Sequence, residues 1–113
     1  MTDPSEPAAD RLDAATLGVG PLGERATLLH FGTAFCQPCR ATRAVLADVA
    51  GMVAGVAHLE IDAEARLDLV RALGVTGTPT VLVLDAAGRV VRRAAGQPRR
   101  VDVIAALGAA IEA

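Results

Sequence analysis

Apolar residues along the chain follow two periods, and the alternation between these periods predicts an alternating order of strands and helices. Short apolar runs between polar or glycine-containing segments predict strands, and the first of these runs is expected to be buried on both faces and central in a sheet. The last two runs are joined by the polar turn 85–88, which predicts a hairpin. The predicted strands are residues 27–31, 56–61, 80–84 and 89–92.

Three other segments place apolar residues three or four positions apart, which predicts helices that pack on the sheet by one face. The first helix should begin at Cys36 and end near residues 51–55. The second has Asp62 as its expected N-cap and stops at Gly74, and the third opens at Pro98. The residues expected on the buried faces are Cys39, Thr42, Leu46, Val49 and Val53 in the first helix, Leu67, Val70 and Leu73 in the second, and Val101, Ile104, Leu107 and Ile111 in the third. This order of elements predicts an α/β fold around a mixed sheet.

The N-terminal region is less regular than the rest. Residues 1–9 are rich in proline, alanine and acidic residues without any period, and they predict a flexible arm. Glycine and proline interrupt residues 11–23, where we expect a first strand and a short helix. Since a chain of 113 residues can bury one core, residues 10–113 are predicted to form a single domain.

Composition narrows the classes of function. Hydrophobic residues make up 52% of the chain and the formal net charge is −2, which favours a soluble globular protein. Aromatic residues make up only 2%, and no broad basic face is expected, so we expect no nucleic acid partner. The chain starts without the pattern of a secretory signal and contains no apolar run that could span a membrane, so a cytoplasmic location and no membrane segment are expected.

The only two cysteines, Cys36 and Cys39, lie where a predicted strand gives way to a helix. Two thiols at this spacing can close a disulfide within the first turn of a helix, and Pro38 suits that turn. Because a helix N-terminus favours an anion, Cys36 is expected to be the attacking thiolate and Cys39 the thiol that resolves the mixed disulfide. A zinc site is the alternative, but His30 and His58 lack the spacing of a zinc finger, so we expect no metal and no other cofactor.

A second motif supports the redox interpretation. Residues 74–80, Gly-Val-Thr-Gly-Thr-Pro-Thr, lead directly into an apolar strand. Together with residues 35–39, the order of strands and helices, and Gly96 after the hairpin, this motif makes the chain from Thr27 onward resemble the thioredoxin family. The resemblance implies the thioredoxin fold, in which a central mixed β-sheet is flanked by helices on both faces.

The resemblance also implies roles for individual residues. Cys36 corresponds to the nucleophile of the family and Cys39 to its resolving cysteine. Pro79 corresponds to a cis-proline beside the dithiol, and the backbone of Thr78 would pair with an extended segment of the substrate. The other residues expected on the substrate-docking surface are Phe35, Gln37, Pro38 and Gly96.

Two histidines depart from the family pattern. His30 stands where thioredoxins bury an aspartate and His58 stands where they bury its lysine partner, so both side chains are expected in one place. His30 could accept the proton of Cys39 as a neutral base, or it could have a purely structural role. A structural role is expected for His58. Gln37, between the cysteines, replaces the usual glycine and leaves the redox potential open.

The leading hypothesis is a thiol:disulfide oxidoreductase that reduces disulfide-containing protein substrates. The resemblance implies an upstream electron donor similar to thioredoxin reductase, and we expect a monomer. Two alternatives stay open: a membrane-associated thiol oxidase or carrier of the same fold, and a non-catalytic redox-sensing binding module. The intact Cys39 and the Thr78–Pro79 motif argue against the module, because an inert domain needs no resolving thiol.

Overall fold

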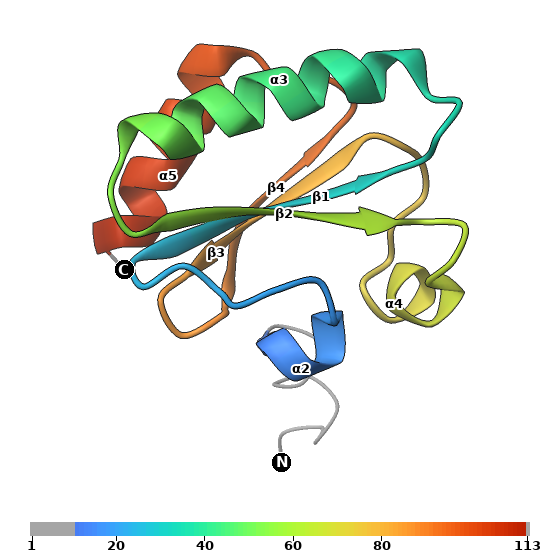
Figure 1. The fold of residues 1–113 in the computed structure, drawn as a ribbon, viewed down its shortest axis with the longest axis horizontal. Helices are drawn as coiled ribbons and strands as arrows, with labels where there is room; N and C mark the ends of the chain where they lie inside the picture. The colour runs from blue at the N-terminus through green and yellow to red at the C-terminus, as the bar shows by residue number, and fades with distance from the viewer. Residues whose placement is uncertain (1–10, 113) are drawn as a thin grey trace.

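The computed structural model describes residues 11–112, and Figure 1 shows how their helices and strands are arranged. The elements in chain order are the helix α2 (Ala14–Leu17), the strand β1 (Ala26–Gly32), the helix α3 (Gln37–Met52), the strand β2 (Val56–Asp62), the helix α4 (Leu67–Ala72), the strands β3 (Thr80–Asp85) and β4 (Val90–Ala95), and the helix α5 (Arg100–Glu112). The predicted arm, residues 1–9, lies outside the described residues, so its boundary with the domain stays a prediction.

The four strands form one mixed sheet in the order β2-β1-β3-β4. β1 pairs in parallel with β2, and α3 forms the crossover between them, whereas β1 with β3 and β3 with β4 pair in antiparallel fashion. Every residue of β1 is buried, which confirms the prediction that this strand is central. The hairpin prediction is also confirmed, and the turn is closed by Asp85, whose carboxylate accepts hydrogen bonds from the backbone N–H groups of Ala87 and Arg89.

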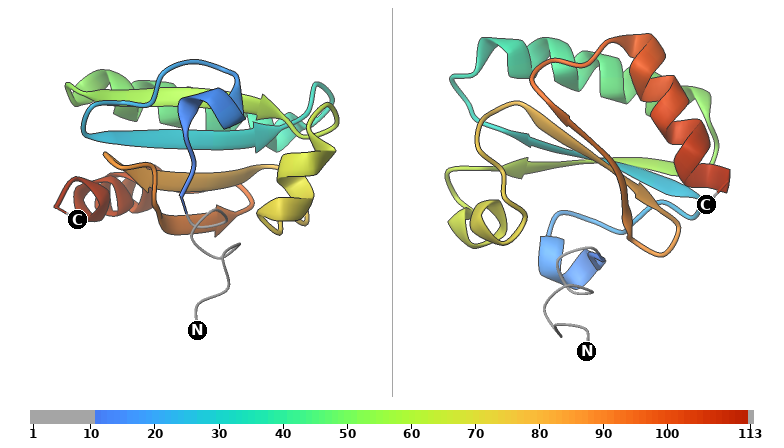
Figure 2. Two further views of the ribbon diagram at one scale, coloured as in Figure 1. Left: turned by 90° about the horizontal axis from the view of Figure 1, so that it is seen from below. Right: turned by 180° about the vertical axis from the view of Figure 1, so that it is seen from behind.

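Helices cover both faces of the sheet, as the thioredoxin fold requires. α3 and α5 lie on one face, and α2 and α4 lie on the other, as Figures 1 and 2 show from several directions. Because successive side chains of a strand point to opposite faces, β1 contributes Leu28 to the core under α3 and α5 but Leu29 and Phe31 to the core on the other side. The sheet therefore separates two apolar cores.

Two local predictions for the chain before β3 are wrong. Residues 11–23 contain the short helix α2, but in place of a first strand the described residues there form only an isolated bridge between Arg11 and Arg89. Asp62 is not an N-cap: α4 begins at Leu67 with Arg66 as its N-cap, and the Asp62 carboxylate instead accepts a hydrogen bond from the backbone N–H of Glu64 in a turn.

The buried stripes of the last two helices also differ from the prediction. In α4, Leu69 is buried and Leu67 is 51% exposed. In α5 the buried residues are Val103, Leu107 and Ala110, whereas Val101 and Ile104 are largely exposed. Because α5 carries apolar residues on more than one side, their spacing does not single out one face. Among residues 11–112 no helix combines the length and apolar character needed to cross a membrane.

Candidate active site

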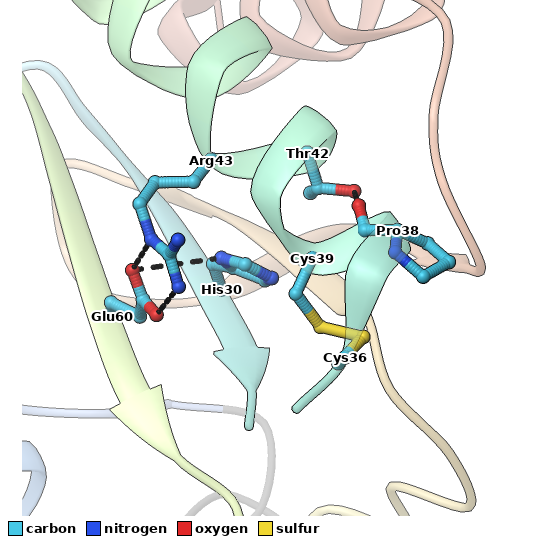
Figure 3. A network of polar contacts seen from close by, with 7 residues as sticks. All are labelled: His30, Cys36, Pro38, Cys39, Thr42, Arg43 and Glu60. Carbon is cyan, nitrogen blue, oxygen red and sulfur yellow. Dashed lines mark hydrogen bonds and ion pairs between the residues drawn. A yellow bond between two sulfur atoms is a disulfide. The ribbon is translucent and has the colours of Figure 1, made fainter. Parts of the chain in front are cut away.

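The two cysteines form a disulfide at the N-terminus of α3 (Figure 3). Cys36 is the N-cap residue in an extended conformation, Pro38 lies in the first turn, and the two Cα atoms are 5.2 Å apart. The backbone closes the turn through a hydrogen bond from the N–H of Cys39 to the carbonyl of Cys36. The Cys36 side chain makes no capping hydrogen bond to this helix. The first backbone N–H groups of α3 can therefore stabilise a thiolate on Cys36.

The two sulfur-bearing residues differ in exposure. Cys36 is partly exposed and Cys39 is fully buried, so only Cys36 can be reached by a large substrate. Phe35, immediately before it, is 96% exposed. A shallow hollow of about 290 Å³ lies beside the disulfide, and its lining residues are Ala34, Phe35, Cys36, Gln37 and Arg40. The geometry separates an accessible sulfur from a protected one.

The second motif reaches the same edge of the sheet. The peptide bond between Thr78 and Pro79 is cis. Thr80 pairs with Phe31 across β3 and β1, which places Pro79 beside the end of β1 from which the cysteine loop leaves. The N–H of Gly96 donates a hydrogen bond of 2.8 Å to the carbonyl of Pro79, so Gly96 joins this edge. Pro79 itself is buried, and Thr78 is partly exposed.

His30 lies behind the disulfide with its ring completely buried. Gly32, two residues later on the same face of β1, leaves open the space between the ring and Cys39. A side chain there would crowd both groups, because a Cβ at Gly32 would lie 3.1 Å from His30 Nε2 and 3.2 Å from Cys39 Sγ. Figure 3 shows the imidazole between Cys39 on one side and Glu60 on the other. The sequence-based placement of His30 near the resolving cysteine therefore agrees with the geometry, while its role is not decided by position alone.

Glu60 and Arg43 form an ion pair beside His30 that the sequence alone did not indicate. Both hydrogen bonds from the Arg43 guanidinium to the Glu60 carboxylate are 2.6 Å long, and Glu60 Oε1 lies 3.9 Å from His30 Nδ1. The hydrogen bonds from Arg43 lower the pKa of the Glu60 carboxyl below its ordinary value, against the opposing effect of partial burial. Glu60 is thus held as a carboxylate next to the histidine.

Desolvation favours the neutral form of both histidines. It lowers the pKa of His30 below its ordinary value, an effect that the Glu60 carboxylate opposes and that His58 and Arg43 reinforce. Burial likewise lowers the pKa of His58. Among residues 11–112, the buried side-chain nitrogen or oxygen atoms without a hydrogen-bond partner are His30 Nδ1, His30 Nε2 and His58 Nε2. All three belong to this one cluster.

The same cluster has a composition from which metal sites are built. One donor atom each from His30, His58 and Glu60 lies within 4.8 Å of the others. However, the Arg43 guanidinium already places a positive charge against Glu60, which opposes the binding of a second cation there. We assign no metal to these residues, and the expectation of a metal-free protein stays a prediction.

The pairing of Glu60 with Arg43 left little trace in the sequence. Glu60 is the one charged residue in the predicted strand 56–61, apart from the titratable His58, and this was the only available signal. Its register neighbour across the parallel pair is His30, but a parallel register is set by the whole crossover and not by a tight turn. Arg43 lies off the buried stripe of α3, so the apolar pattern indicates no partner for it. Their meeting depends on how α3 crosses the sheet.

Comparison with known proteins agrees with the fold. A sequence profile of the thioredoxin-like domain matches residues 12–111. A mutant thioredoxin from Halobacterium salinarum NRC-1 superposes with a TM-score of 0.74 at 23% identity, covering 89% of this chain and 83% of that one. Thioredoxin from Fasciola hepatica gives 0.67 at 19% identity (78% and 83%), and chloroplastic thioredoxin z gives 0.66 at 25% identity (75% and 77%). None of the curated protein sequences compared with the chain matches it.

A mixed sheet with helices on both faces and a close pair of cysteines at a helix N-terminus are the features of a thiol:disulfide oxidoreductase in general. The chain belongs to the thioredoxin-like domain family, whose profile spans nearly all of the described residues.

Proposed function

We propose that the protein reduces disulfides in other proteins by dithiol exchange, with Cys36 as the nucleophile and Cys39 as the resolving thiol. The observation that carries this proposal is the difference between the two cysteines, since Cys36 is accessible at a helix N-terminus and Cys39 is buried behind it. A thiolate on the exposed sulfur can meet a substrate disulfide, whereas the buried thiol can reach only Cys36.

The reaction then has two exchange steps. The Cys36 thiolate attacks one sulfur of the substrate disulfide, a Cys36–substrate bond forms, and the other substrate sulfur leaves as a thiolate. Cys39 next attacks Cys36, the second substrate thiolate leaves, and the protein ends with a Cys36–Cys39 disulfide, the form present in the structure. Each cycle moves two electrons from the dithiol to the substrate.

The surface around Cys36 supports docking through the substrate backbone. We place the substrate over Phe35, Gln37 and Pro38, which are all exposed. An extended segment of the substrate would pair with the backbone of Thr78, next to Pro79. Gly96 would border this segment. Because such recognition depends on few substrate side chains, we expect many proteins to be substrates.

The resolving step requires a base, because Cys39 must lose its proton before it attacks. We assign this role to His30, whose neutral ring lies on the same side of Gly32 as Cys39 Sγ. His58 is kept as a structural neighbour of that ring. No metal or other cofactor is needed for either exchange step.

The setting of the reaction follows the reductase assignment. We propose a cytoplasmic monomer that is returned to its dithiol form by a donor similar to thioredoxin reductase. The same geometry would serve a membrane-associated thiol oxidase or carrier, for which the redox potential would be higher, and a redox-sensing module, for which turnover would be absent. The accessible Cys36, next to the exposed residues Phe35 and Gln37, favours a catalyst over a non-catalytic redox-sensing module.

Reduction of insulin by dithiothreitol tests the proposal. The wild-type protein should accelerate the precipitation of the insulin B chain, and Cys36→Ser should abolish that acceleration. Equilibration with glutathione of known redox ratio then gives the potential. A value as low as about −270 mV would support a reductase, whereas one near −120 mV would indicate an oxidase. If the wild-type protein gives no acceleration, the redox-sensing module is the better interpretation.

A further inference from the structure

The imidazole of His30 joins the dithiol to an ion pair at the surface. Its Nε2 faces the space above Gly32 that Cys39 Sγ also borders, and its Nδ1 lies 3.9 Å from Glu60 Oε1. Within residues 11–112 neither nitrogen has a hydrogen-bond partner, although the ring is completely buried. A buried polar atom without a hydrogen-bond partner is energetically costly. Such an atom is explained if it gains its partner in another state of the reaction.

The fold places the carboxylate close to that ring. His30 and Glu60 are register neighbours on the parallel strands β1 and β2, and both lie on the face covered by α3. Arg43, from α3, donates two hydrogen bonds to Glu60 and holds it in place. On its outer side this group borders a solvent-open hollow of about 350 Å³ lined in part by Gly32, Arg43 and Glu60.

A carboxylate beside one nitrogen of a histidine determines what the other nitrogen can do. The negative charge of Glu60 favours the tautomer with its proton on Nδ1, which leaves the lone pair of Nε2 directed toward the Cys39 side. The same charge stabilises the imidazolium once Nε2 has accepted a proton, while the carboxylate itself stays ionised.

We propose that Glu60, held by Arg43, is a positioning residue for the resolving step: it sets the tautomer of His30 and stabilises the imidazolium that forms when Cys39 gives up its proton. This inference rests on the proposed function and adds to it a specific carboxylate. Cys39 then gives its proton to His30, and Glu60 acts on His30 without exchanging a proton.

Resolution begins with a proton transfer and ends with a sulfur exchange. The proton of the Cys39 thiol moves to His30 Nε2, the Cys39 thiolate attacks Cys36, and the bond between Cys36 and the substrate sulfur breaks. The Cys36–Cys39 bond forms, and the substrate leaves as a thiolate, which can take a proton from solvent or from the imidazolium. The distance of 3.9 Å from Glu60 to the ring is about 1 Å longer than a hydrogen bond, and we expect it to shorten when the imidazolium forms.

The charged groups around His30 support this arrangement. Glu60 and His58 belong to β2, and Arg43 and Cys39 belong to α3. Figure 3 shows Glu60, Arg43 and Cys39 around the ring. Among them Glu60 alone favours the charged ring, because Arg43 and a protonated His58 would both oppose it. Removing the charge of Glu60 therefore deprives the imidazolium of the group that compensates its charge.

A single-turnover experiment tests the proposal. Reduced protein is mixed with a disulfide-bonded peptide, the reaction is quenched with acid, and mass spectrometry follows the mixed disulfide. Glu60→Gln keeps the size of the side chain and removes its charge. It should slow resolution roughly tenfold to a hundredfold, and the upper value equals the smallest contribution that is typical of general acid–base catalysis. Attack by Cys36 should be unchanged. Glu60→Asp, which retains the charge, should be impaired less than Glu60→Gln.

A double-mutant cycle separates positioning from mere packing. His30→Ala should slow resolution at least as much as Glu60→Gln, and the double variant should be no slower than His30→Ala, because the two residues act as one unit. The matched control is Asp48→Asn, which removes the carboxylate of another α3 ion pair, the 2.9 Å contact with Arg100, and should leave resolution unchanged. Far-UV circular dichroism checks that each variant is folded.

Three results would overturn the proposal. They are an unchanged resolution rate in Glu60→Gln, additive effects of Glu60→Gln and His30→Ala, or a wild-type rate that falls when EDTA is added, which would indicate a bound metal at these residues. A wild-type protein that never forms the mixed disulfide would instead contradict the proposed function itself.

Discussion

Side chains on the two faces of the sheet differ in chemistry although the same strands supply both. The face under α2 and α4 is an apolar core, in which Phe31, Ile61 and Leu82 are fully buried. The face under α3 and α5 is apolar around Leu28, but toward the cysteines it carries His30 and its polar neighbours. One face is thus packed with apolar side chains throughout, whereas on the other face polar and reactive groups replace part of the apolar packing.

This difference shows how alternation in a strand separates stability from chemistry. Leu29 and His30 are adjacent in sequence, yet each belongs to a different side of the sheet. Burying a histidine without hydrogen bonds destabilises the fold, and the fully apolar face opposite offsets that cost. The comparison predicts that substitutions on the apolar face change stability alone.

The largest expected effect is on the apolar face. Leu82→Ala should lower the free energy of unfolding by about 2–5 kcal/mol, because it leaves a cavity in a fully buried core. Urea denaturation followed by far-UV circular dichroism measures this loss. The resolution rate of the folded molecules should stay close to that of wild type. Leu82→Met, with a cost under about 1.5 kcal/mol, keeps the comparison possible if the alanine variant does not fold.

A large change in the resolution rate of Leu82→Met would show that the two faces are coupled. The conclusion that one face determines stability and the other the chemistry would then be wrong, even if the loss of stability is as expected.

Most of this architecture could be predicted from the sequence, and the failures have physical reasons. The four strands of the sheet and α3 were correctly placed because their apolar patterns are unambiguous, whereas the strand expected in residues 11–23 was not found. The face of α5 was not, because Val101 and Val103 are equally apolar and only packing decides between them. The cysteine pair and His30 could be identified from motif and position, whereas Glu60 and Arg43 could not, since their contact depends on a parallel register and a helix crossing.

A smaller effect concerns pH on the polar face. The pKa of His30 is lower in the folded protein than its ordinary value near 6.5, so at pH values below about 6.5 the unfolded chain binds more protons than the folded one. Stability should therefore be complete above this range and fall as the pH is lowered through it, by at most roughly 1.4 kcal/mol per pH unit for this residue. His58 acts in the same direction.

Urea denaturation between about pH 5.5 and about pH 7.5, a range chosen around the ordinary histidine pKa near 6.5, measures this slope. In His30→Asn the slope should be reduced, because one of the two histidine rings whose pKa is lowered is absent. An equal slope in wild type and variant would mean that burial of His30 does not penalise its charge, and the polar face would then resemble an ordinary solvated surface.

The central claim is that the exposed cysteine attacks and the buried one resolves. Trapping tests it most directly: reduced Cys39→Ser and reduced Cys36→Ser proteins are each incubated with a disulfide-bonded substrate, and the products are separated by non-reducing electrophoresis and identified by mass spectrometry. The account predicts that Cys39→Ser accumulates a stable mixed disulfide through Cys36 and that Cys36→Ser accumulates none. A mixed disulfide through Cys39 in the Cys36→Ser protein, formed at a comparable rate, would contradict it.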